Sequence, residues 1–144
     1  MKKFPKKNWS RLTLSVCLSA ALSGCYQGPD PQKFFGSATE ASLEIYFGGG
    51  EQVFTTPIEQ TSDPELIRRY SSFIGPDKTK AYTCGYDGRI VFTKDDVGYD
   101  VNFNLDPSCR HFAYIIGDAL YCRTITDEGL DYITEKITEA SEKI

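Results

Sequence analysis

The stretch HFAYIIGDALYCRTITDEGLDYITEKI, residues 111–137, decides the fold class. Two runs rich in aromatic and β-branched residues flank Gly117-Asp118, a dipeptide typical of a two-residue hairpin turn. Thr126 then precedes two acidic residues and an apolar pattern of helical period, which indicates a capped helix. Its apolar face is expected to comprise Leu130, Ile133, Ile137 and Ile144. A hairpin followed by an amphipathic helix predicts an α+β domain.

The predicted hairpin has apolar or aromatic residues on both of its faces. A two-residue turn at 117–118 sets Tyr114 opposite Tyr121. It also sets Phe112 opposite Arg123, while aliphatic residues occupy the other face. We expect helices to cover both faces. If one face stays open, then Phe112, Tyr114 and Tyr121 form an aromatic patch for a partner.

Upstream of this hairpin, the sequence predicts five more strands and one more helix. The strands are expected around Leu43–Phe47, Glu51–Thr56, Tyr82–Cys84, Ile90–Phe92 and Tyr99–Leu105. The helix begins at Asp63-Pro64 and ends at Gly75-Pro76. A three-residue loop at 86–88 would set Cys84 opposite Ile90. The predicted order is ββαβββββα, an antiparallel meander sheet packed against one or two helices.

The first 24 residues have the polarity profile of an export signal. Five basic residues precede any acidic one, and the apolar segment Leu12–Leu22 follows them. As a helix, this segment would span about 16 Å, roughly half of a ~30 Å hydrocarbon core. It is therefore too short to remain as a transmembrane span.

The end of this leader, Leu22-Ser23-Gly24-Cys25, resembles the lipobox of bacterial lipoproteins. The resemblance implies that Cys25 receives a diacylglycerol on its thiol and becomes the first residue after cleavage. Further acylation, with palmitate among the chains, would hold the protein at the membrane, because two or three acyl chains anchor a protein stably. Tyr26 in place of an Asp after the cysteine favours the outer membrane, facing the periplasm. The alternative is an ordinary secretory leader that ends near a cysteine.

Three parts of the chain are therefore expected: signal peptide 1–24, flexible tether 25–40 and one α+β domain, 41–144. From Cys25 onward there are 120 residues, with all 20 acidic residues and 11 of the 16 basic ones, a net charge of −9. A domain this acidic is a poor ligand for nucleic acid or anionic lipid surfaces.

Cys84, Cys109 and Cys122 follow Cys25 in the exported part, where disulfides are stable. The hairpin register sets Cys122 opposite Ala113, too far from Cys109 to bridge. We expect a disulfide from Cys84 to either Cys109 or Cys122, which leaves one thiol unpaired.

Two neighbourhoods could carry chemistry. Cys109 and His111 would share one side of a strand, as a Cys–His nucleophile pair requires, but the simpler interpretation is a disulfide beside a surface histidine. Asp100–Asp106 resembles the start of a calcium loop, but Leu105 replaces its glycine and position twelve is not Glu. We therefore predict no catalytic residue, no cofactor and no metal.

Tyr82-x-Cys84-x-x-Asp87-Gly88 resembles a strand and turn of the periplasmic lysozyme inhibitors of the membrane-bound C-type family, which are also lipoproteins. The chain has no counterpart of that family's Ser-Gly inhibitory loop, so no functional residue is carried over. The sequence favours a non-enzymatic lipoprotein of the cell envelope that binds or assembles with a protein partner. The alternative is a periplasmic enzyme inhibitor, or a small enzyme that uses the Cys109/His111 region.

Overall fold

The computed structural model describes residues 25–49 and 52–143. The predicted export signal, part of the glycine turn at 48–50 and the helix-face residue Ile144 lie outside the described residues. Within the described ranges, no helix is both long and apolar enough to cross a membrane.

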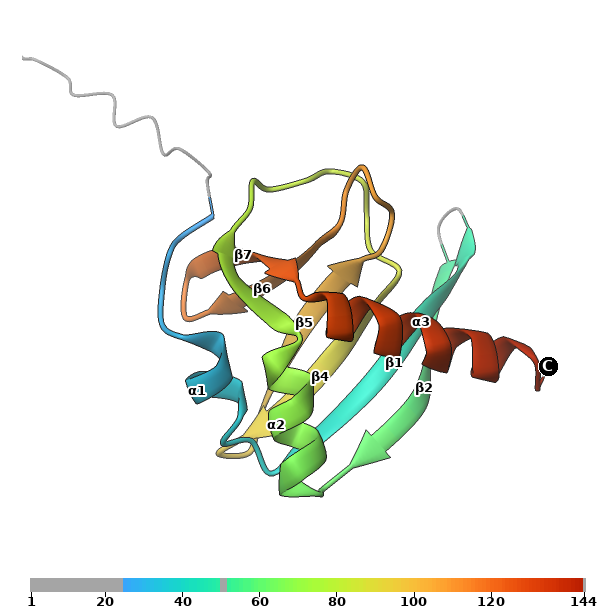
Figure 1. The fold of residues 1–144 in the computed structure, drawn as a ribbon, viewed down its shortest axis with the longest axis horizontal. Helices are drawn as coiled ribbons and strands as arrows, with labels where there is room; N and C mark the ends of the chain where they lie inside the picture. Colours follow the sequence, from blue (N-terminus) through green and yellow to red (C-terminus); the bar gives the residue numbers. More distant parts are fainter. Residues whose placement is uncertain (1–24, 50–51, 144) are drawn as a thin grey trace, which may run out of the picture.

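The described residues form a seven-stranded antiparallel sheet and three helices, so the predicted α+β class is confirmed (Figure 1). In chain order the elements are α1 Pro31–Phe35, β1 Glu40–Gly49, β2 Gln52–Thr61, α2 Pro64–Ser72, β3 Ile74–Lys78, β4 Gly88–Lys94, β5 Val97–Asn104, β6 His111–Ile116, β7 Ala119–Ile125 and α3 Asp127–Ser141. The strands lie in the order β2-β1-β4-β5-β6-β7-β3.

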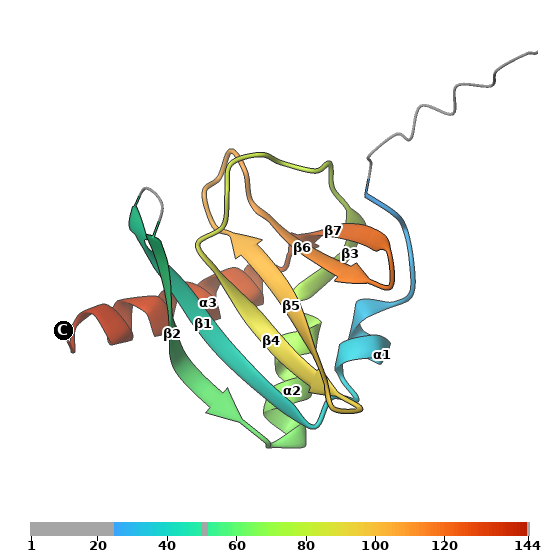
Figure 2. The same cartoon turned by 180° about the vertical axis from the view of Figure 1, so that it is seen from behind.

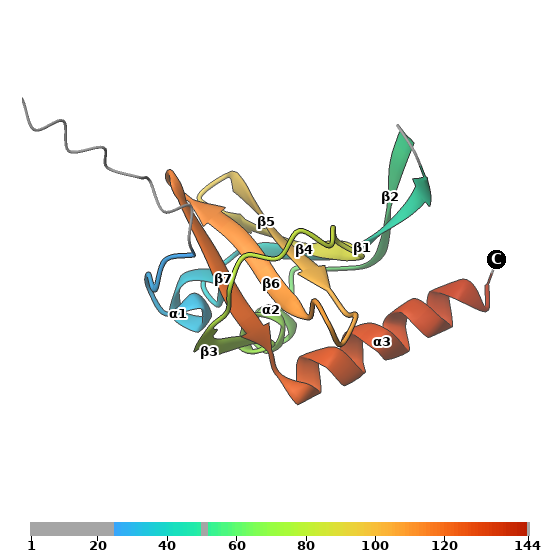
Figure 3. The ribbon, with the colours of Figure 1, turned by 90° about the horizontal axis from the view of Figure 1, so that it is seen from above.

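The chain enters the sheet as the β1–β2 hairpin, and α2 then carries it to the opposite edge, where β3 pairs with β7 (Figure 2). From β4 to β7 consecutive strands are neighbours, which is the predicted meander. The three helices lie on one face of the sheet (Figure 3). Side chains from all of them, among them Phe35, Ile67 and Ile133, join one hydrophobic core there.

Two local predictions are confirmed in detail. In the β6–β7 hairpin, Tyr114 faces Tyr121 and Phe112 faces Arg123, because the two-residue turn fixes the register. Both predicted helix caps are present. The Asp63 side chain accepts a hydrogen bond from the Glu65 backbone N–H at 3.0 Å, and Thr126 accepts one from Gly129 at 3.1 Å.

The predicted strand at Tyr82–Cys84 is wrong. The third strand is β3, which contains the Gly75-Pro76 pair that was expected to end the helix. Ile90 lies opposite Leu43 and Val101, so β4 pairs with β1 and β5 instead of with residues 82–84. The alternating residues Tyr82 and Cys84 lie in a loop instead. In this loop the Tyr82 ring packs against His111, and Cys84 is bonded to Cys109.

The predicted flexible tether at 25–40 also differs from the structure. Residues 31–35 form α1, which begins at the cap residue Asp30, and Glu40 already belongs to β1. Phe35 is completely buried and packs against Phe92 at 4.8 Å and Tyr114 at 5.1 Å between ring centroids. Burial of this aromatic ring holds the segment on the domain.

The candidate aromatic patch is covered, but the expectation that helices cover both faces of the hairpin is wrong, because Ile115 on the other face is 60% exposed. Phe112 and Tyr114 are buried, and Tyr121 is half-buried. Phe35 covers Tyr114 from α1, and a Cβ at Gly28 would collide with the Tyr121 ring. The N-terminal segment therefore occupies the surface that a partner would have used.

Candidate functional site

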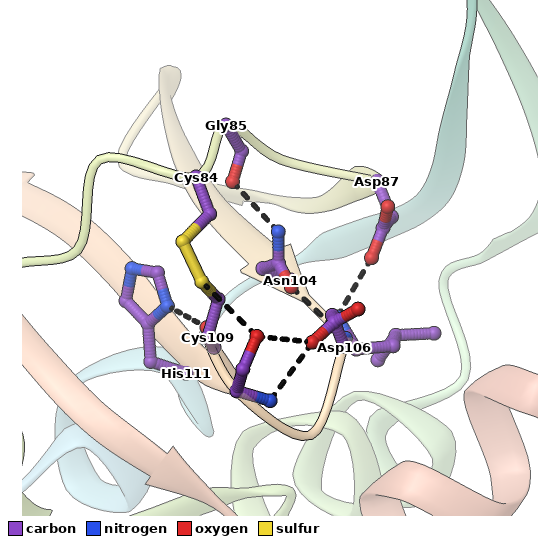
Figure 4. The surroundings of a disulfide bond; sticks show 9 residues. Cys84, Gly85, Asp87, Asn104, Asp106, Cys109 and His111 are labelled. Carbon is purple, nitrogen blue, oxygen red and sulfur yellow. Dashed lines mark hydrogen bonds between the residues drawn. A yellow bond between two sulfur atoms is a disulfide. The ribbon is translucent and has the colours of Figure 1, made fainter.

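Two cysteine pairs lie at disulfide distance. Cys84 is bonded to Cys109, with Cα atoms 6.3 Å apart, which is one of the two predicted pairings (Figure 4). Cys25 is bonded to Cys122, with Cα atoms 5.3 Å apart. Cys122 was expected to be paired with Cys84 or left free, so this second pair departs from the prediction.

His111 is buried, and the predicted surface histidine is wrong. Its Nδ1 lies 2.7 Å from the Cys109 carbonyl oxygen, and its ring packs against Tyr82 and Tyr86. Its Nε2 is buried without a hydrogen-bond partner. Because the Cys109 sulfur is bonded to Cys84, it has no thiolate to offer as a nucleophile while the disulfide is intact.

The polar residues at 100–106, which resemble the start of a calcium loop, bond to other protein groups: Asp100 pairs with Arg89, Asn102 accepts from the Tyr46 hydroxyl, and Asn104 and Asp106 bond backbone groups (Figure 4). Asn104 donates from Nδ2 to the Gly85 carbonyl at 3.0 Å. Asp106 accepts from the Ser108 hydroxyl and backbone N–H, and these bonds lower the pKa of its carboxyl. Nearby, Asp87 accepts from the Leu105 N–H at 2.7 Å. Residues 25–49 and 52–143 contain no cluster of three or more His, Cys, Asp or Glu suited to a metal.

An open apolar surface lies where the inner face of the β1–β2 hairpin extends past the helices. Leu43 is completely buried, Ile45 is half-buried and Phe47 is 50% exposed, so the core becomes an open surface toward the hairpin tip. The helix α3 diverges from the hairpin in the same direction (Figure 3). The space between them, which we call the hairpin–helix groove, has a volume of about 580 Å³. Its lining comprises Ile45, Phe47, Thr56, Pro57, Ile58, Glu59, Lys136, Glu139, Ala140 and Lys143.

Glu59 forms a polar network at the base of this groove. Its Oε2 accepts hydrogen bonds from the hydroxyls of Tyr70, at 2.5 Å, and Tyr132, at 2.6 Å. Lys136 Nζ lies 3.9 Å from Glu59 Oε1. Burial raises the pKa of both Tyr70 and Tyr132, and the hydrogen bond to Glu59 raises it further. The pKa of Tyr132 reaches about 12. Both tyrosines therefore stay protonated and act as donors, which joins α2 and α3 to β2.

The tip of the hairpin carries an exposed aromatic pair. Phe47 and Phe54 lie opposite each other on β1 and β2, and their rings stack at 6.0 Å. Phe54 is 54% exposed and its neighbour Val53 is 65% exposed. An apolar groove beside exposed aromatic rings is a surface suited to binding.

The sequence does not predict the groove, because the groove depends on the angle between α3 and the hairpin. The available signal was the tip itself, where Phe47 directly precedes the glycine triplet and Val53 and Phe54 follow it. Comparisons of the chain with protein-family models, curated proteins and solved structures find no match. The function proposed below therefore derives from the residues and geometry of this chain.

Proposed function

We propose that this protein is a lipid-anchored, non-enzymatic protein of the bacterial cell envelope that binds a protein partner through the hairpin–helix groove. The observation that supports this most is the position of the groove. It lies between the β1–β2 hairpin and α3, on the opposite side of the molecule from β7, to which Cys25 is bonded (Figures 1 and 3). A chain anchored at Cys25 would present the groove away from the bilayer.

Export and anchoring rest on the leader and on the lipobox-like residues at 22–25. The Cys84–Cys109 disulfide, which does not involve the proposed lipid site, suits an oxidising compartment such as the periplasm. The net charge of −9 from Cys25 onward keeps the folded part from lying on anionic lipid. Tyr26 supports the outer membrane, facing the periplasm, as the location.

The polar side chains at the two candidate sites are already bonded or buried, which favours binding over catalysis. Glu59 in the groove is occupied by two tyrosine donors. The rival site for a small enzyme, Cys109 with His111, has a bonded sulfur and a buried ring. In contrast, the groove combines the volume and apolar lining that protein and peptide ligands use.

The Cys25–Cys122 pair favours a second candidate, a secreted domain without a lipid. One sulfur cannot carry both a thioether to a lipid and a disulfide. If Cys25 stays bonded to Cys122, the leader acts as an ordinary export signal and the domain is released. The N–H of Tyr26 donates to the Leu120 carbonyl at 2.9 Å, so the segment is held on β7 by backbone contacts in either form.

Metabolic labelling with a palmitate analogue in bacteria separates the two candidates. The anchored protein is expected to incorporate label in the natural form and in Cys122→Ser, whereas Cys25→Ser incorporates none. The Cys122→Ser variant is the matched control, since it removes the competing disulfide without touching the lipid site. An unlabelled natural protein recovered from the soluble fraction would overturn the anchor and favour the secreted domain.

A further inference from the structure

The two edges of the sheet are protected very differently. At one edge, β3 has five residues, including Pro76, Asp77 and Lys78, and Tyr26 pairs with the remaining half of β7. At the other edge, β2 has ten residues, and positions 52–57 are exposed throughout. It carries no charged side chain between Gln52 and Ile58. Natural edge strands are usually short, charged or covered, so β2 has the properties of an edge that receives another strand.

The helix α3 extends beyond this edge. Figures 1 and 2 show its C-terminal end projecting past β2, outside the sheet. A strand added beside β2 would therefore have its inner side chains covered by the last turns of α3, where Ala140 and Lys143 line the groove. An additional strand can therefore pair with the exposed edge of β2 and pack its inner side chains against the last turns of α3.

We propose that the hairpin–helix groove receives an extended segment of a partner protein, which pairs with β2 as an eighth strand. This inference rests on the proposed function and specifies how the partner binds. Backbone pairing would run along Gln52–Thr56, because Pro57 has no N–H to donate. Alternate apolar side chains of the segment would then enter the groove beside Phe54 and Ile58, the arrangement by which sheets bind peptides.

The charge of this domain indicates which charged residues the partner segment carries. In the last turns of α3 and the two residues after it, Glu135, Glu139 and Glu142 outnumber Lys136 and Lys143, and the chain from Cys25 onward has a net charge of −9. A second copy of this chain would bring two such helices together above the paired strands, where like charges repel. In an extended segment whose apolar residues face α3, the intervening lysine or arginine residues point to the other face of the sheet, and the net charge of −9 from Cys25 onward attracts them to the domain as a whole. The partner segment is therefore cationic and alternating.

The test uses the mature protein in lipid nanodiscs and a ten-residue probe in which Val, Phe and Ile alternate with Lys and Thr. Two control peptides accompany it: one is N-methylated on alternate backbone nitrogens, and one has Glu in place of each Lys. Calorimetry is expected to show saturable micromolar binding of the probe and at least tenfold weaker binding of both controls. No saturable binding of the probe, or equal binding of the N-methylated peptide, would overturn strand addition.

Two variants locate the binding. Ala140→Arg fills the groove with a good helix-forming residue and is expected to weaken probe binding at least tenfold. Ile115→Arg, at a position 60% exposed on β6, is the matched control and should bind like the natural protein. Thermal melting checks that both variants are folded. Equal loss in the two variants, or a dimer in sedimentation that Ala140→Arg abolishes, would overturn the inference, whereas failure of palmitate labelling would overturn only the anchor.

Discussion

At the scale of single residues, Glu59 bonds two tyrosines and lies near Lys136 on the inner face. It accepts from two tyrosines on different helices, and Tyr70 among them is completely buried. Hydrogen bonds to a charged acceptor stabilise a fold more than neutral ones. The same carboxylate sits at the base of the groove, so its role is to fix the angle between α3 and the hairpin.

Glu59→Gln is expected to lower the free energy of unfolding by about 2 kcal/mol, because both tyrosine hydroxyls lose their charged acceptor. Urea denaturation measures this. Glu139→Gln is the matched control: its carboxylate is 47% exposed and contacts only Lys136, so it should change stability by less than about 0.5 kcal/mol. Equal stability of the two variants would show that the Glu59 network contributes nothing.

Tyrosine ionisation should destabilise the domain at high pH. Burial raises the pKa of Tyr114 and Tyr132 from 10.0 to about 12, and their folded state binds the proton more tightly than the unfolded state. Their contribution is therefore complete below pH 10 and is lost as the pH rises to 12. Absorbance of tyrosinate should show the two groups titrating late, together with unfolding. Titration of all nine tyrosines near pH 10 in a folded protein would contradict this.

At the scale of elements, α1 converts the N-terminal segment into part of the domain. Phe35→Ala should lower the free energy of unfolding by about 3–5 kcal/mol, since it empties a completely buried aromatic site. Phe54→Ala, at the exposed tip, is the control and should cost no more than about 1 kcal/mol. Equal and small effects in denaturation would mean that residues 31–35 are a tether after all.

The loop at 79–87 is held over His111 by the Cys84–Cys109 bond. The bonded residues are 25 positions apart, and closing a loop of this length stabilises a fold by about 3 kcal/mol. The double variant Cys84→Ser, Cys109→Ser is expected to lose that amount. Hydrogen exchange in residues 79–87 should also become faster, while exchange in β6 changes less. Unchanged exchange in the loop would show that the disulfide does not restrain it.

Elements with strong local signals could be predicted from the sequence. The caps Asp63 and Thr126 and the turn at 117–118 act within a few residues, so α2, α3 and the β6–β7 register follow from them. The errors arose where distant contacts decide the structure. Tyr82 alternates like a strand residue but packs on His111 from a loop, and Phe35 lies in a polar, proline-containing segment yet joins the core.

At the scale of the whole molecule, the proposed lipid anchor and the proposed binding surface lie on opposite sides. Figure 3 shows β7, to which Cys25 is bonded, on one side of the molecule, and the β1–β2 hairpin and the C-terminal end of α3, whose residues line the groove, on the other. No local pattern in the sequence could predict this arrangement, because it depends on how far α3 projects past the sheet. The proposed lipid anchor at Cys25, in contrast, rests on four consecutive residues of the sequence.

We propose that the thiol of Cys25 carries lipid. The intact mass of the mature protein, measured under non-reducing conditions, tests this directly. The account predicts a chain that begins at Cys25 with added diacylglyceryl and acyl mass, one disulfide between Cys84 and Cys109, and one thiol, Cys122, that alkylates after unfolding. A lipid-free chain with two disulfides and no reactive thiol would contradict it.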